Sequence, residues 1–179
     1  MVRLGVMKGN WPVKLPYLAL FALGTVPVFA QSSDLVNALA KHWERSQAFS
    51  AAVADAMPDD GYSFKASPPE MTFGEMVNHI AAANGNYCSA ALGTENPIGR
   101  PKDASKSAAT QNLQKAYDYC ISGLKKLTDA DLMKTVGPAE RHQTAFEALW
   151  GGFTHSAHHR AQLEVYLRLK GIKPPDYKF

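Results

Sequence analysis

Residues 72–92, TFGEMVNHIAAANGNYCSAAL, carry the pattern that decides the fold of this 179-residue chain. Thr72 is followed three residues later by Glu75, which is a capping box, the pairing that satisfies free backbone amides at a helix start. Apolar side chains then recur at helical spacing along one face: Phe73, Met76, Val77, Ile80, Tyr87 and Ala91. The stretch is therefore predicted to be an amphipathic helix that ends near Leu92.

Three further segments show apolar residues at helical spacing: 34–57, 105–127 and 144–170. The first follows Ser32-Ser33-Asp34, a run typical of a helix N-cap, and the last begins with a second capping box at Thr144 and Glu147. No stretch shows the period-two alternation of a strand, and the residues between the last two helices are expected to form a polar connection. Four amphipathic helices without strands predict an all-α protein, a four-helix bundle.

The first thirty residues differ from the rest of the chain. Residues 1–14 contain three basic residues and no acidic one. An uncharged and mainly apolar stretch follows at 15–28, and small residues precede the Ala30–Gln31 bond. This three-part layout is typical of a secretory signal peptide, and fourteen apolar residues are too few to cross a hydrocarbon core of ~30 Å. We predict a signal peptide over 1–30 and an exported domain, periplasmic or secreted, over 31–179. An uncleaved anchor is the alternative, and Met7 is an alternative start.

Composition and charge limit the classes of protein. The chain is 46% hydrophobic and 20% charged, as globular domains are, which excludes a disordered or collagen-like chain. Its formal net charge is +3, and removing the three basic residues of the leader leaves equal numbers of bases and acids. A neutral domain gives no electrostatic basis for binding nucleic acid or an anionic membrane. No later stretch reaches eighteen apolar residues, so no membrane span is expected after cleavage.

Histidines carry the chemical signal, and all six lie beyond the leader. His155 and His159 are four residues apart in the last predicted helix, on nearly the same side, where both can bind one ion. His158 is the competing partner of His155, but it lies roughly opposite the apolar centre of that helix. A third ligand is normally required, and His79 is the candidate from the helix at 72–92. It lies at the edge of the apolar stripe, which suits a ligand and a surface histidine equally.

Several motifs that identify classes of enzyme are absent from the sequence. Ser156 follows His155 where zinc proteases carry a glutamate as general base, so that class is excluded. The sequence has no glycine-rich phosphate loop, no Gly-x-Ser-x-Gly elbow and no CxxC pair. Glu75 lies one turn before His79, but the capping box already uses it. The histidines therefore have no evident general base beside them.

Two blocks of the sequence together resemble the DinB-like superfamily. They are TFGEMVNH at 72–79, which opens the second predicted helix, and HSAHHRAQL at 155–163. The resemblance extends from Ser32 to the end of the chain. It implies an up-down-down-up four-helix bundle with one divalent metal ion held by three histidines, which map onto His79, His155 and His159.

The resemblance also implies a function. Superfamily activities include metal-dependent transfer of low-molecular-weight thiols, so the chain is expected to be an exported metal-dependent transferase or hydrolase, whose substrate the sequence does not identify. Zinc or nickel is expected, because imidazole suits both metals and no thiolate or carboxylate adjoins the site. The missing general base favours the alternative, a non-catalytic module for small-ligand binding or stress response. A third hypothesis is a homodimer in which Trp43, Trp150 and Phe153 cover a partner's helices.

The chain has two cysteines, Cys88 and Cys120. They are either two small core residues or a disulfide, which export to an oxidising compartment favours. In a simple antiparallel hairpin the two would lie about 15 Å apart along the helices. In the up-down-down-up order the second and third helices are parallel, and both cysteines lie at nearly the same height. The resemblance therefore implies a Cys88–Cys120 disulfide.

Overall fold

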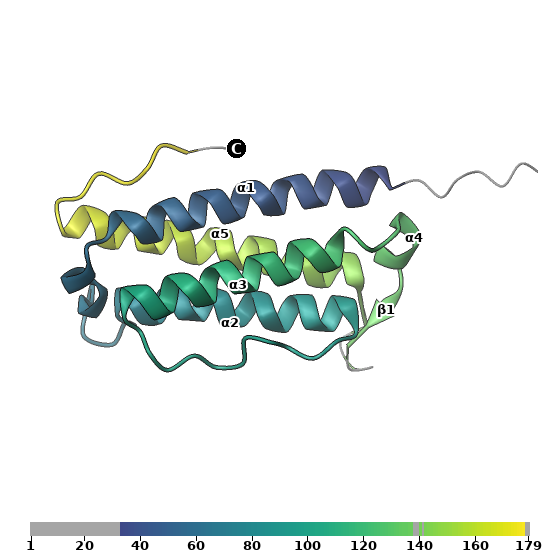
Figure 1. The fold of residues 1–179 in the computed structure, drawn as a ribbon, viewed down its shortest axis with the longest axis horizontal. Helices are drawn as coiled ribbons and strands as arrows, with labels where there is room; N and C mark the ends of the chain where they lie inside the picture. Colours follow the sequence, from purple (N-terminus) through teal and green to yellow (C-terminus); the bar gives the residue numbers. More distant parts are fainter. Residues whose placement is uncertain (1–32, 138–139, 141, 178–179) are drawn as a thin grey trace, which may run out of the picture.

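The computed structural model describes residues 33–137, 140 and 142–177 (Figure 1). The long helices of this part of the chain are α1 (Asp34–Ala56), α2 (Phe73–Leu92), α3 (Lys106–Leu124) and α5 (Ala145–Leu169). The short elements are η1 (Asp59–Ser63), α4 (Asp129–Leu132), β1 (Thr135–Val136) and β2 (Gln143–Thr144). The chain is mostly helical, as expected. The predicted leader, residues 1–30, and its cleavage site lie outside the described residues.

The four long helices form a bundle in which α1 and α5 run one way and α2 and α3 run the other (Figure 1). The long segment 93–105 returns beside α2 so that α3 can run parallel to it. α2 packs on α3 and α5, and α1 packs on the same two helices, so α1 and α2 lie diagonally across the bundle. This order makes α2 and α5 direct neighbours. None of the helices in the described part is both long and apolar enough to span a bilayer.

The core is built from the apolar faces of all four long helices. Its fully buried large side chains include Trp43, Phe49, Met76, Ile80, Tyr117, Leu149 and Leu163. The hypothesis that Trp43 covers a partner's helices is wrong, because its side chain is fully buried and packs edge-on against Tyr117. Trp150, by contrast, is 51% exposed on α5 and stacks between Phe146 and Phe153.

The N-terminus of α1 is capped by a residue distant in the sequence, and not by the side chain of Ser33 at its start. Ser33 occupies the N-cap position, but its side chain makes no capping hydrogen bond. The backbone amides of Leu35 and Val36 instead donate to the two carboxylate oxygens of Asp129, at 3.3 and 2.9 Å. Asp129 belongs to α4, 93 residues further along the chain from Val36, so only the folded bundle brings this cap into place.

This cap gives a stability prediction with a matched control. Replacing Asp129 by Ala should lower the free energy of unfolding by about 1 kcal/mol, because two backbone amides of α1 lose their acceptor. Replacing Ser33 by Ala should change it little, because that side chain caps nothing. Urea denaturation of both variants measures the difference, and equal losses would contradict the assignment of the cap to Asp129.

The prediction that the chain has no strands is wrong in one place. β1 and β2 pair antiparallel, with Thr135 opposite Thr144 and Val136 opposite Gln143. α4 precedes them within the stretch that was expected to be a plain polar connection. Strands of two residues are too short to show alternation of apolar and polar side chains, so the sequence pattern could not reveal them.

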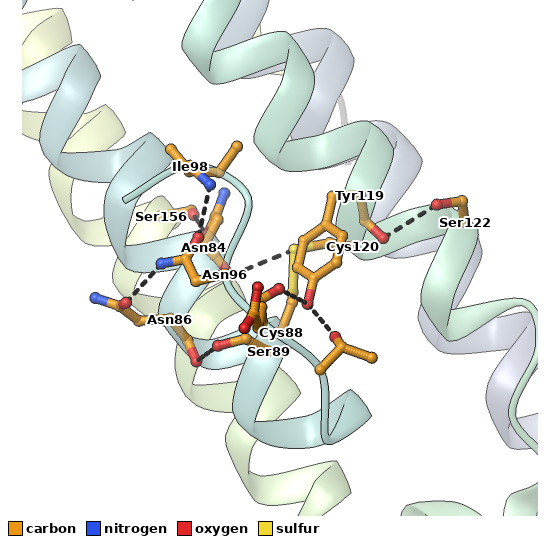
Figure 2. The surroundings of a disulfide bond; sticks show 12 residues. Asn84, Asn86, Cys88, Ser89, Asn96, Ile98, Tyr119, Cys120, Ser122 and Ser156 are labelled. Carbon is orange, nitrogen blue, oxygen red and sulfur yellow. Dashed lines mark hydrogen bonds between the residues drawn. A yellow bond between two sulfur atoms is a disulfide. The ribbon is translucent and has the colours of Figure 1, made fainter. Parts of the chain in front are cut away.

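Cys88 of α2 and Cys120 of α3 form a disulfide at the buried interface of these two helices (Figure 2). Their Cα atoms are 5.4 Å apart, and both side chains are fully buried. The parallel course of α2 and α3 places the two residues at the same height, which an antiparallel hairpin would not do. The bridge therefore ties the two helices together across the connecting segment 93–105.

Candidate metal centre

Two glycines of α5, Gly151 and Gly152, allow this helix to lie close to α2 just before His155. A Cβ atom on Gly151 would lie 2.9 Å from the ring of Tyr87, and one on Gly152 would lie 3.0 Å from its Cβ. Larger residues at these two positions would push α5 away from α2. The ring centroid of Tyr87 also lies 5.9 Å from that of His155, one turn further along α5.

The structure brings His79 of α2 together with His155 and His159 of α5; we call these three side chains the histidine cluster. The Nε2 atom of His79 lies 3.1 Å from Nε2 of His155 and 3.1 Å from Nε2 of His159. One ligand atom from each residue lies within 4.8 Å of the others, and all three side chains are partly buried. In the described part of the chain, no other group of three or more His, Cys, Asp or Glu side chains converges in this way.

His158 and His42 do not contribute ligand atoms to the histidine cluster. His158 is exposed, and its ring forms a T-shaped pair with that of His159, with centroids 4.8 Å apart. His42 contacts the ring of Phe153, on the α1 side of α5. Glu75 is held in the capping box of α2, as expected from the sequence, because its carboxylate accepts the backbone amide of Thr72 at 2.7 Å.

Burial keeps the histidine cluster uncharged at neutral pH. Desolvation lowers the pKa of His79. Desolvation, and then repulsion from His159, His79 and His158, lowers the pKa of His155 to about 4. Desolvation also lowers the pKa of His159, against a raising effect of its hydrogen bond to Gln162. Each imidazole is therefore present in the unprotonated form that binds a metal ion.

The distances between the ring nitrogens and the tautomer of His159 fit a bound divalent cation. Two nitrogens held at about 2.1 Å from one tetrahedral ion lie about 3.4 Å apart, close to the 3.1 Å that separates Nε2 of His79 from each of the other two Nε2 atoms. His159 Nδ1 lies 2.6 Å from Oε1 of Gln162, so Nδ1–H donates to this oxygen and Nε2 keeps its lone pair for an ion. The buried Nδ1 of His155 has no hydrogen-bond partner in the described structure.

Gln162 is a neighbour of the histidine cluster that sequence reasoning missed. It lies three residues after His159, so both side chains project from the same side of α5. Amide side chains that accept a hydrogen bond from a ligating imidazole fix its tautomer and orientation. The spacing of the two residues in the sequence was the available signal.

The lowered pKa of His155 gives a pH prediction for the metal-free protein. Below its ordinary value of 6.5 the unfolded chain binds a proton at His155, whereas the folded chain stays neutral there until about pH 4. Protons therefore favour unfolding, and stability should fall as the pH is lowered from about 6.5 to about 4. Urea midpoints of wild type and His155→Gln between pH 7.5 and 4.5 measure this. The variant should lose less stability over the window, and identical losses would refute the prediction.

Comparison with known proteins agrees with this architecture. The sequence pattern of the DinB superfamily matches residues 39–163. The fold is similar to that of a DinB-like protein from Bacillus cereus ATCC 10987, with 21% identity, a TM-score of 0.69, and coverage of 79% of this chain and 97% of that one. It is also similar to the DinB-like protein YjoA from Bacillus subtilis, with 21% identity, a TM-score of 0.67, and coverage of 79% and 99%. No curated protein matches the chain.

Proposed function

This chain belongs to the DinB superfamily, and on that premise we propose that it binds one divalent metal ion through His79, His155 and His159. The observation that carries the proposal is the convergence of three uncharged imidazoles, with Nε2 of His79 3.1 Å from each of the other two. Zinc or nickel suits this donor set, because neither thiolate nor carboxylate takes part.

The residues around the histidine cluster suit an open site. Three protein ligands leave a fourth position for a substrate or water, where a divalent ion supplies Lewis acidity. The imidazoles carry no charge to offset that of the ion, so a ligand at this position would become more acidic. Gln162 holds His159 in the ligating tautomer. We propose a metal-dependent transferase or hydrolase that acts at this position.

A non-catalytic ligand-binding module is the second candidate, and one observation favours it. Glu75 carries the carboxylate one turn from His79. Its Oε2 accepts the backbone amide of Thr72, and its own backbone amide donates to the Thr72 hydroxyl. Its hydrogen bonds to Thr72 lower its pKa, so it accepts protons weakly. A site without a strong general base suits ligand binding as well as it suits catalysis by the ion alone.

Export and association are further parts of the proposal. The layout of residues 1–30 supports secretion through a signal peptide, and a Cys88–Cys120 disulfide suits an oxidising compartment. The stack of Phe146, Trp150 and Phe153 on α5, in which Trp150 is exposed and the two phenylalanines are half-buried, is the surface that a second copy would cover in a homodimer. Mass measurement of the mature protein in solution distinguishes the dimer from the monomer.

Metal analysis of the mature protein, purified without a histidine tag, tests the metal site directly. We expect about one zinc or nickel ion per chain, either as purified or after adding the metal to chelator-treated protein. Fewer than about half of the chains loaded, with no change on adding either metal, would refute the proposal.

A further inference from the structure

A pocket of about 160 Å³ opens beside the histidine cluster and shares His79 with it. One wall comes from α2, with Glu75, Asn78 and His79, and the other comes from Arg100, Pro101 and Lys102 of the connecting segment 93–105. Two cations therefore line the same small space as a proposed metal ligand. The metal site by itself does not require either of them.

The connecting segment is held against α2 on both sides of these cations. On one side, Asn96 Nδ2 donates to Asn86 Oδ1 at 2.7 Å, and a Cβ on Gly85 would lie 2.3 Å from Asn96 Oδ1 (Figure 2). On the other side, Asn78 Nδ2 donates to the backbone oxygen of Asp103 at 2.8 Å. A Cβ on Gly74 would likewise collide with the segment, 2.0 Å from the backbone oxygen of residue 104. These contacts hold the segment against α2 at residue 96 and at residues 103–104, on either side of the two cations.

Arg100 and Lys102 are available to a ligand. They are two residues apart in an irregular part of the chain, and both line the pocket. Both are exposed, and neither appears in a salt bridge within the described structure. The nearby carboxylates are engaged elsewhere: Glu75 accepts the amide of Thr72, and Asp103 accepts the amide of Ser105 at 2.9 Å.

We infer that this pocket binds the acid group, carboxylate or phosphate, of a small anionic substrate whose other end reaches the ion at His79. The inference rests on the proposed metal site and names the substrate class for it. The guanidinium of Arg100 can donate two parallel hydrogen bonds to an acid group, and Lys102 adds a second positive charge. A divalent ion at the histidine cluster would add two further positive charges, against the single carboxylate of Glu75 in the pocket wall.

The test uses the mature protein loaded with cobalt(II), whose visible absorption reports changes at the ion. Imidazole-4-acetate is the anionic probe, because its ring nitrogen can bind the ion while its carboxylate reaches the pocket. Imidazole is the matched neutral probe, which binds the ion without an acid group. In the double variant Arg100→Ala/Lys102→Ala, imidazole-4-acetate should bind about tenfold or more weakly than in wild type. Imidazole should bind both proteins equally.

A matched control separates this pocket from a general loss of positive charge. Lys41 and Arg45 are exposed on α1, away from the pocket, so Lys41→Ala/Arg45→Ala removes the same charge elsewhere. The control should bind imidazole-4-acetate as wild type does. Stoichiometric cobalt with equal imidazole-4-acetate affinity in all three proteins would overturn this inference and leave the metal site standing. Failure to bind cobalt in wild type would overturn both.

Discussion

Replacing His159 by Ala should remove most of the bound metal and leave the helical fold intact. His159 supplies one of three converging nitrogens, and the two remaining imidazoles make a weak site for zinc or nickel. The affinity should fall by more than about 100-fold, the upper end of the loss expected for residues that only orient a ligand. Metal content by elemental analysis and titration of chelator-treated protein measure the loss, and circular dichroism checks the fold.

His158→Ala is the control for this variant. His158 adjoins His159 in the sequence, but its side chain is exposed and lies outside the histidine cluster. This variant should keep the metal content and affinity of the wild type. An unchanged metal content in His159→Ala, or an equal loss in His158→Ala, would show that the cluster is not the metal site.

Removing the disulfide should give the largest loss of stability. The bond joins residues 32 apart in the sequence, and closing such a loop in the unfolded chain contributes about 3–4 kcal/mol in the chain-entropy model. The double variant Cys88→Ala/Cys120→Ala should therefore unfold about 10 °C below wild type. Metal binding should be retained, because Cys88 lies nine residues from His79, about 13 Å along α2.

Reduction of the wild type separates the bond from the substitutions. Both cysteines are fully buried, so a thiol reductant should open the bridge only when the protein is partly unfolded by denaturant. The reduced wild type and the double alanine variant should then show similar losses of stability. Two titratable thiols per chain in denatured, unreduced protein from an oxidising compartment would refute the disulfide.

The sequence by itself determined the helices and the residue types of the site. The capping boxes at Thr72 and Thr144 and the apolar stripes are local signals, so the starts of α2 and α5 follow from residues within one turn. The spacing of His155 and His159 likewise places two imidazoles on one side of a helix. These features depend only on residues that are close in the sequence, so a sequence pattern is sufficient to predict them.

Contacts between distant residues were decided only by the tertiary structure. The Asp129 cap of α1 joins segments more than ninety residues apart, and nothing near Ser33 indicates it. The burial of Trp43 depends on which helices become neighbours, because an apolar side chain can cover a core or a partner equally well. The pairing of α2 with α5 brings His79 to the other two histidines, and the connecting segment places Arg100 and Lys102 beside them. Such placements depend on how the helices pack, which the local pattern of the chain does not encode.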